Sequence, residues 1–163
     1  MAVRLVTTDD VEAIRDVARA SWEADYPGIL SRETATEAVE EWYSPSQVEQ
    51  AVADPLTVVS VAEREGVVVG FAHSVLDEDT GVILRLYVHP EHRNEGIGRN
   101  LFEATREELL TRDAERIRAM VLAENDPGNS FYQRLGFERV GQGETVIGEE
   151  TFSENRYELR QPG

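Results

Sequence analysis

The spacing of apolar residues predicts a strand and then helices over the first third of the chain. Val3–Val6 is a short apolar run, and the polar residues 7–10 after it are typical of a helix N-terminus. Apolar side chains then recur at three- and four-residue intervals, which places them on one face of a helix. They are Val11, Ile14, Val17, Ala18 and Trp22. Residues 26–28 break this helix, and two further helical segments are expected from Ser31 to about Tyr43 and from Ser44-Pro45 to about Asp54-Pro55.

Strand patterns begin at residue 56 and are separated by turn residues. Leu56–Glu63 and Val67–Val75 flank Arg64-Glu65-Gly66, which is typical of a hairpin turn. A second turn at residues 77–81 leads into the apolar strand Val82–Val88. We therefore expect three strands in succession in this part of the chain.

The last part of the chain alternates helices and strands. The expected elements are a helix over about 97–113, a strand Arg116–Leu122, a short helix between Asp126-Pro127 and Gly136, a strand over 137–140 and 145–147, and a strand Phe152–Arg160. Asp126 is expected to cap its helix, with Pro127 in the first helical position. Gly141-Gln142-Gly143 is expected to interrupt its strand, and the last strand is expected to close the sheet.

This order of elements predicts an α/β fold of the α+β type, in which a mixed sheet is flanked by helices. We expect one domain over residues 1–163. The chain has no apolar run of about 18 residues, and Met1–Leu5 leads into a strand instead of the apolar segment of a signal peptide. We expect a cytoplasmic protein. Because the chain has no cysteine, an acyl-cysteine intermediate is excluded.

The charge of the chain is strongly negative. The net charge is −16, and all 16 basic residues other than histidine are arginine. A negative field of this size disfavours nucleic acid and anionic membranes as partners. Acidity without lysine is what we expect of a protein from a high-salt cytoplasm, where self-repulsion is screened. The alternative is an acidic mesophilic protein with a GC-biased composition.

A strand, a glycine-bearing loop and a helix start follow one another at residues 82–101. The loop contains Arg93-x-x-Gly96-x-Gly98, and the helical pattern opens at Ile97. Free N–H groups at a helix N-terminus, beside glycines that allow close approach, form a site for a diphosphate. Basic side chains also cluster here against only Glu91 and Glu95. They are Arg85, His89, His92, Arg93 and Arg99. The sequence therefore predicts an anionic cofactor at this loop.

Two common phosphate-binding loops do not fit these residues. A Walker loop needs Lys and then Ser or Thr after its last glycine, whereas Arg99-Asn100 follows Gly98. A dinucleotide-binding loop needs a third glycine, where Leu101 stands.

The segment instead resembles the pyrophosphate loop of the GCN5-related N-acetyltransferase (GNAT) family. That loop is usually written Arg/Gln-x-x-Gly-x-Gly/Ala and follows a strand that ends in Leu-Tyr-Val-x-Pro. The matching residues are Leu86, Tyr87, Val88, Pro90, Arg93, Gly96 and Gly98. Residues 125–137 resemble a second family segment, Asn-x-x-Ala-x-x-Phe-Tyr-x-x-x-Gly-Phe, with Gly128 in place of the alanine. The residues that match there are Asn125, Phe131, Tyr132, Gly136 and Phe137.

The resemblance implies the acyl-CoA N-acyltransferase fold, with a mostly antiparallel sheet, and direct transfer of acetyl from acetyl-CoA to a primary amine. The acceptor is a protein N-terminal or lysine amine or a small-molecule amine. Tyr132 is implied as the catalytic acid that protonates the leaving thiolate. The residues implied to bind the cofactor are Leu86, Tyr87, Val88, Arg93, Asn94, Glu95, Gly96, Ile97, Gly98, Arg99 and Asn125. Candidates for acceptor binding are Trp22, Tyr26 and His73.

The resemblance implies no metal and is compatible with a homodimer. It leaves the general base open, because many relatives have a carboxylate at the positions of Leu84 or Arg85, and this chain has neither. Other candidates are His73, Asp77, Glu78, Glu124 and a water chain. A module that binds acyl-CoA without catalysis is the main alternative, and a nucleotide-binding protein that uses the Gly96–Gly98 loop is a third.

Overall fold

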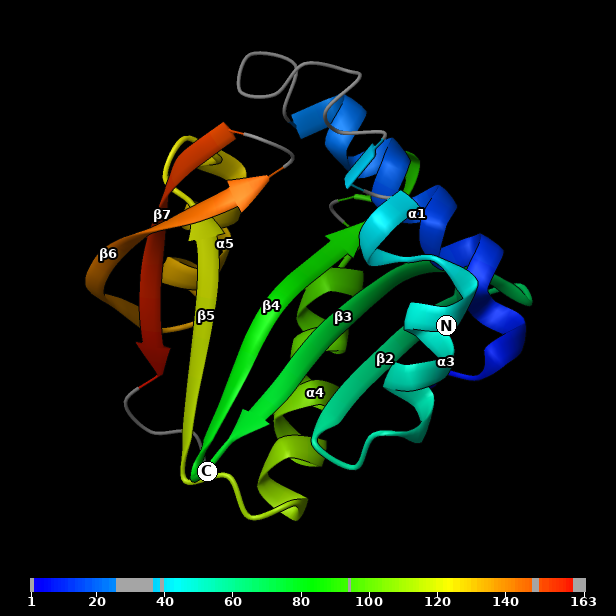
Figure 1. The fold of residues 1–163 in the computed structure, drawn as a ribbon, viewed down its shortest axis with the longest axis horizontal. Helices are drawn as coiled ribbons and strands as arrows, with labels where there is room; N and C mark the ends of the chain where they lie inside the picture. The colour runs from blue at the N-terminus through cyan, green and yellow to red at the C-terminus, as the bar shows by residue number, and fades with distance from the viewer. Residues whose placement is uncertain (1, 26–36, 39, 94, 148–149, 160–163) are drawn as a thin grey trace.

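A seven-stranded sheet with helices on both faces forms the protein (Figure 1). The computed structural model describes residues 2–25, 37–38, 40–93, 95–147 and 150–159. The strand order is β1-β2-β3-β4-β5-β7-β6, and every pair of neighbours is antiparallel except β4 and β5. The expected fold class, a mixed and mostly antiparallel sheet flanked by helices, is confirmed.

The elements follow the order expected from the sequence. The strands are β1 (Ala2–Leu5), β2 (Thr57–Arg64), β3 (Val67–Asp77), β4 (Thr80–Val88), β5 (Arg116–Leu122), β6 (Phe137–Ile147) and β7 (Glu150–Leu159). The helices are α1 (Val11–Asp25), α3 (Pro45–Ala53), α4 (Ile97–Thr111) and α5 (Asp126–Arg134), with short 3-10 turns η1 (Thr8–Asp10) and η2 (Pro90–His92). Residues 37–38 and 40–42 are also helical. The expected helix break at residues 26–28 lies outside the described residues.

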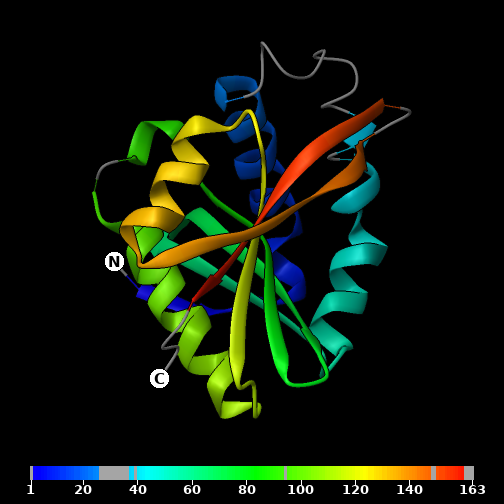
Figure 2. The same ribbon diagram turned by 90° about the vertical axis from the view of Figure 1, so that its left-hand side faces the viewer.

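The helices divide between the two faces of the sheet (Figure 2). Helices α1 and α3 pack on one face, and α4 and α5 pack on the other. The predicted apolar stripe of α1 is buried against its face from Ile14 to Trp22. Helix α4 likewise buries its predicted stripe, Ile97, Leu101, Phe102, Thr105 and Leu109. Each face therefore has its own part of the core.

Polar side chains fix the helix starts in the N-terminal part. The Asp10 carboxylate accepts from the Thr7 amide at 2.8 Å and from both terminal nitrogens of Arg4, at 2.8 and 2.9 Å. These bonds lower the pKa of Asp10, and the Arg4 guanidinium is the largest cause. At the start of α3 the Ser44 hydroxyl accepts from the Gln47 amide, as its cap position predicts.

Three details of the C-terminal part differ from the sequence-based expectation. Asn125, not Asp126, caps α5, and its side-chain oxygen accepts from the Gly128 amide at 3.1 Å. The glycines at 141 and 143 do not interrupt β6, because the extra residue is absorbed as a bulge between Arg139 and Gly141. The last strand, β7, does not close the sheet but lies between β5 and β6, so β6 is the edge.

The parallel neighbours β4 and β5 are paired over only four residues. Thr80–Ile83 lies beside Arg116–Ala119, and no pairing continues beyond Ile83. From there the two strands diverge toward their C-terminal ends (Figure 1). The sheet therefore has a gap in its middle, between residues 84–88 and residues 120–122.

Candidate active site

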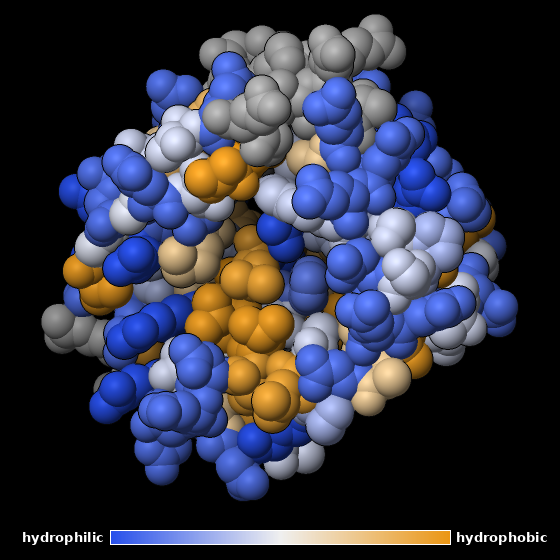
Figure 3. Space-filling model, viewed as in Figure 1, coloured by the Kyte–Doolittle hydropathy of each residue, from blue (hydrophilic) through white to orange (hydrophobic). Residues whose placement is uncertain are grey.

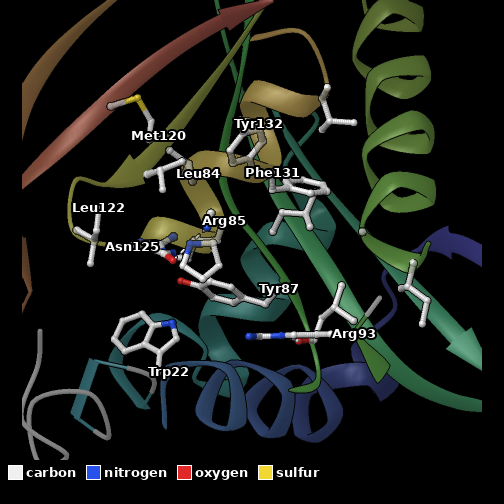
Figure 4. Close-up of a pocket in the computed structure, with 18 of the residues that line it drawn as sticks. Trp22, Leu84, Arg85, Tyr87, Arg93, Met120, Leu122, Asn125, Phe131 and Tyr132 are labelled. Carbon is white, nitrogen blue, oxygen red and sulfur yellow. Dashed lines mark hydrogen bonds between the residues drawn. The ribbon is translucent and has the colours of Figure 1, made fainter. Parts of the chain in front are cut away.

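A cavity of about 450 Å³ opens at this gap, and side chains from both faces of the sheet line it. Its walls come from the diverging ends of β4 and β5, the start of α4, helix α5, Trp22 of α1 and the strands β6 and β7 (Figure 4). Apolar side chains gather in the hollow (Figure 3). The cavity therefore connects the α4–α5 side of the sheet to the α1–α3 side.

The glycine-bearing loop forms one end of the cavity. Gly96 is the N-cap of α4 and has φ of 82°, a left-handed conformation that favours glycine. Gly98 lies where an added Cβ would be 3.2 Å from the Phe131 ring of α5, so the two helices approach closely there. Arg93 Nε donates to the Val88 carbonyl at 3.2 Å and ties the loop to the end of β4. The start of α4 therefore presents two residues without side chains, Gly96 and Gly98, to the cavity.

Nine of the eleven residues expected to bind the cofactor line this cavity. They are Leu86, Tyr87, Val88, Arg93, Gly96, Ile97, Gly98, Arg99 and Asn125. Asn94 lies outside the described residues. Glu95 does not line the cavity, because its carboxylate pairs with Arg64 of β2 and lies 3.9 Å from His92 Nδ1. The Arg64 pair holds the carboxylate outside the cavity.

Guanidinium groups dominate the charge at the loop end of the cavity. Arg93, Arg99 and Arg134 line it together with His92. This donor set, with the N-terminus of α4, fits the phosphates of coenzyme A. The arrangement is local, since the chain as a whole has a net charge of −16.

Tyr132 lies in the middle of the cavity wall on the α5 side. Its ring is 5% exposed, stacks on Tyr157 with the centroids 6.3 Å apart, and meets Phe137 edge-on. Burial raises the pKa of the Tyr132 phenol, and the neighbouring Tyr87 phenol adds to this shift. The hydroxyl therefore stays protonated at neutral pH and is able to donate a proton.

Asn125 and Asn129 hold the end of β5 against α5. Asn125 is 8% exposed and lines the cavity while its oxygen caps the helix. The amide nitrogen of Asn129 donates to the carbonyls of Leu122 and Asn125, and its oxygen accepts from Tyr157 Oη at 2.6 Å. The side chain of Asn129 is thus used in hydrogen bonds within the protein. Of the two asparagines, only Asn125 lines the cavity.

Aromatic rings line the cavity on the α1–α3 side. The centroid of Trp22 is 5.3 Å from that of Trp42 and 6.4 Å from that of Tyr87, and both contacts are edge-on. The Arg85 guanidinium carbon lies 3.9 Å from the centroid of Trp42, in cation–π contact. We call this part of the cavity, lined by Trp22, Trp42, Arg85 and Tyr87, the aromatic chamber. Trp22 was expected at the acceptor site, whereas Tyr26 lies outside the described residues.

His73 faces a different cavity. It pairs with Arg85 in the β3–β4 register, and its ring centroid is 6.2 Å from that of Tyr43. A second cavity of about 210 Å³, between α3 and β2–β3, includes His73, whereas the main cavity does not. Burial and then the charge of Arg85 lower the pKa of His73 to about 4. Its imidazole is therefore neutral at physiological pH and does not line the main cavity, although His73 was expected at the acceptor site.

The other candidates for the general base also lie away from the cavity. Asp77 and Glu78 lie at the β3–β4 turn, and Glu124 is an exposed residue outside the cavity wall. Four further residues line the cavity that the sequence pattern did not indicate, namely Trp42, Met120, Arg134 and Glu154. Glu154 reaches the cavity because β7 is inserted between β5 and β6, and the order of elements along the chain does not predict this insertion. Within the described residues, no group of three or more His, Asp or Glu side chains could hold a metal ion.

No helix in the described part of the chain is long and apolar enough to cross a membrane.

Comparison with known proteins places this architecture in context. The model of the Acetyltransferase (GNAT) family matches residues 12–137. A spermidine N(1)-acetyltransferase of Thermoplasma acidophilum is 26% identical over 160 residues, which cover 96% of this chain and 97% of that protein. The crystal structure of the PaiA N-acetyltransferase from the same organism, in complex with coenzyme A, has a TM-score of 0.79 at 25% identity and covers 96% of this chain and 100% of that one. A GCN5-related N-acetyltransferase from Rhodopseudomonas palustris has a TM-score of 0.80 at 21% identity, over 97% of this chain and 94% of that one.

Proposed function

Because the chain belongs to the GNAT acetyltransferase family, we propose that it transfers an acetyl group from acetyl-CoA directly to a primary amine. One observation carries the proposal, a cavity that runs through the sheet at the β4–β5 gap. Its loop end offers helix amides and guanidinium groups, and its other end is the aromatic chamber. Tyr132 lies between the two ends.

The residues around the gap have distinct roles in this proposal. The amides at the start of α4, with Arg93 and Arg99, bind the pyrophosphate. Backbone amides of residues 86–88 in β4, next to the gap, polarise the thioester carbonyl. Tyr132 donates its proton to the leaving sulfur. Bound acetyl-CoA supplies the acetyl thioester, and the absence of cysteine from the chain supports direct transfer to the acceptor.

The acceptor is a primary aliphatic amine of a small molecule or peptide. The spermidine N(1)-acetyltransferase among the relatives makes small amines the first group to test. The experiment measures thiol release from acetyl-CoA over a panel that contains spermidine, other diamines and monoamines, amino acids and a lysine peptide. We expect turnover with at least one amine class, and coenzyme A should bind more tightly than ATP or NAD. Tight binding of acetyl-CoA without acetylation of any amine would refute the proposal.

A further inference from the structure

Glu154 is the only carboxylate among the described residues that line the main cavity. The chain has 32 acidic residues, and the other side chains of the cavity wall are basic, neutral polar or apolar. A lone carboxylate in a site of this kind is a candidate for recognising a cationic group.

The register of β7 places Glu154 on the same side of the sheet as the aromatic chamber. Asn155 and Tyr157 bond to Asn129 of α5, so these residues face the α4–α5 side. Because successive side chains in a strand alternate between faces, Glu154 points to the α1–α3 side. Its neighbour on β5 is Leu122, the last residue of the strand that borders the gap. Glu154 therefore lies at the gap but opposite the helix that carries Tyr132.

Within the described residues, the Glu154 carboxylate makes no hydrogen bond and no ion pair. The contrast with Glu158 on the same strand and face is direct, because Glu158 Oε2 lies 3.3 Å from Arg118 Nε. Glu154 is also half-buried, so few water molecules can solvate its charge. A half-buried carboxylate that makes no direct ion pair is open to a cationic ligand that binds it directly.

The surroundings make Glu154 a better proton acceptor than an ordinary glutamate. Burial raises the pKa of its carboxyl group, while Arg85 of β4 and Arg156 of the same strand oppose the shift. Its cross-strand neighbours, Leu122 of β5 and Gly143 of β6, have no charge. Tyr87 is the remaining polar residue of the chamber.

We propose that Glu154 binds the ammonium form of the acceptor amine at the aromatic chamber and takes a proton from it. The inference rests on the proposed function and adds to it the general base and the side chain that binds the ammonium group of the acceptor. The acceptor is a primary alkylammonium ion, whose apolar chain fits the Trp22 and Trp42 rings and whose charged end pairs with the carboxylate.

Glu154, Tyr132 and water account for every proton of the transfer. Glu154 takes one proton from the ammonium group, which leaves a neutral amine. The amine nitrogen forms the C–N bond to the thioester carbon, and the C–S bond breaks with its electron pair on sulfur. Tyr132 gives its proton to sulfur and regains one from the nitrogen of the new amide. Glu154 then releases its proton to water.

Glu154→Gln tests the proposal, with Glu144→Gln of β6 as the matched control. Glu144 is exposed and does not line the cavity. We expect Glu154→Gln to lower kcat/KM for the amine at pH 7 by about 10²- to 10⁴-fold, the range for one general base, with unchanged affinity for coenzyme A. The control should keep the wild-type value.

The pH profile separates a chemical role from a structural one. In the wild type, kcat/KM should be flat between the raised carboxyl pKa and the pKa of the amine, because the ionised base and the ammonium ion are the reacting forms. In Glu154→Gln only the neutral amine reacts, so kcat/KM should rise about tenfold per pH unit up to the amine pKa. Glu154→Asp should keep the flat profile at a reduced rate.

Three outcomes decide the question. A wild type that acetylates no amine refutes the proposed function itself. A Glu154→Gln variant with the rate and profile of an active wild type refutes the role of Glu154 alone. If the glutamine variant does not fold, Glu154→Asp decides, and a tenfold rise per pH unit in that variant also refutes the role.

Discussion

Tyr132 shows how the surroundings of one residue suit it to one reaction step. Phe131, Phe137 and Tyr157 surround its ring, and its hydroxyl end lies at the cavity near Tyr87. The rings fix the position of the phenol, and burial keeps it protonated. Position and protonation are what a proton donor to a leaving thiolate needs.

Tyr132→Phe should lower kcat by about 10²- to 10⁴-fold, because the ring keeps its packing but the proton donor is lost. Affinity for acetyl-CoA, measured by calorimetric titration, should hardly change. Tyr157→Phe is the matched control, because it removes a phenol that bonds to Asn129 and does not line the cavity. The control should lose about 1–3 kcal/mol of stability and keep kcat. Equal kcat in folded Tyr132→Phe and wild type would assign the proton to another group.

His73 should make the stability of the protein depend on pH. Its pKa in the fold is about 4, below the value of about 6.5 in an unfolded chain. Its stabilising effect is therefore complete above pH 6.5 and is lost as the pH falls toward 4, because the unfolded chain takes up a proton first. The free energy of unfolding should fall by on the order of 3 kcal/mol over this window. In His73→Gln, urea melts across the same window should show a shallower fall, and parallel curves would contradict the assignment.

The site residues that could be predicted from the sequence are those with local signatures. Gly96, Gly98 and Tyr132 belong to short segments whose spacing alone identifies them, and all three line the cavity. Glu154 and Trp42 have no such segment, because they reach the cavity through long-range packing of β7 and of the helical residues 40–42. His73 was assigned from its residue type, and only the strand register shows that it faces another cavity.

At the scale of elements, polar caps and turn residues predict where helices and strands end more accurately than apolar runs do. The β2–β3 hairpin turns at Glu65 and Gly66, both with positive φ, where the sequence predicts a turn. The glycines of β6 suggest a break in the strand, but glycine also occurs in bulges, and the structure has a bulge there. The place of β7 inside the sheet depends on pairing with β5, and the paired residues are 32 to 42 positions apart in the chain, which no local pattern encodes.

Gly96→Val should weaken binding of acetyl-CoA at least tenfold, since a β-branched residue at φ of 82° displaces the first amides of α4. Gly66→Val is a matched control, because Gly66 has φ of 81°, also has no atom within 4 Å of an added Cβ, and lies in the β2–β3 turn. Both variants should lose about 1–3 kcal/mol of stability from backbone strain. Calorimetric titration should show a loss of affinity in Gly96→Val alone. An equal loss, or none, in both variants would mean that the loop does not bind the phosphates.

At the scale of the whole molecule, the positive cavity contrasts with a negative surface. The net charge of −16 implies self-repulsion in the folded chain, which dissolved ions screen. The guanidinium groups at the loop end of the cavity are a local exception, at the place where we propose that the anionic cofactor binds.

Stability should rise with salt. Thermal melts from about 0.1 to 3 M KCl cover screening lengths from about 10 Å to below 3 Å. We expect the melting temperature to increase across this range. A variant in which the exposed Glu49, Glu107 and Glu144 become glutamine should show a smaller increase. A melting temperature that does not change with salt would refute the high-salt interpretation of the composition.

The short parallel pairing between β4 and β5 also has a consequence for how the chain folds. Strands β2, β3 and β4 are joined by tight turns, and β6 and β7 form a second hairpin, so each group is built from neighbours in sequence. The two groups meet through the β4–β5 pairing and the β5–β7 pairing. These pairings close longer loops than the hairpins do, so they cost more chain entropy. We expect each group to collapse early and the two to dock late. Because the main cavity takes its walls from both groups, it is then the last part of the native structure to assemble.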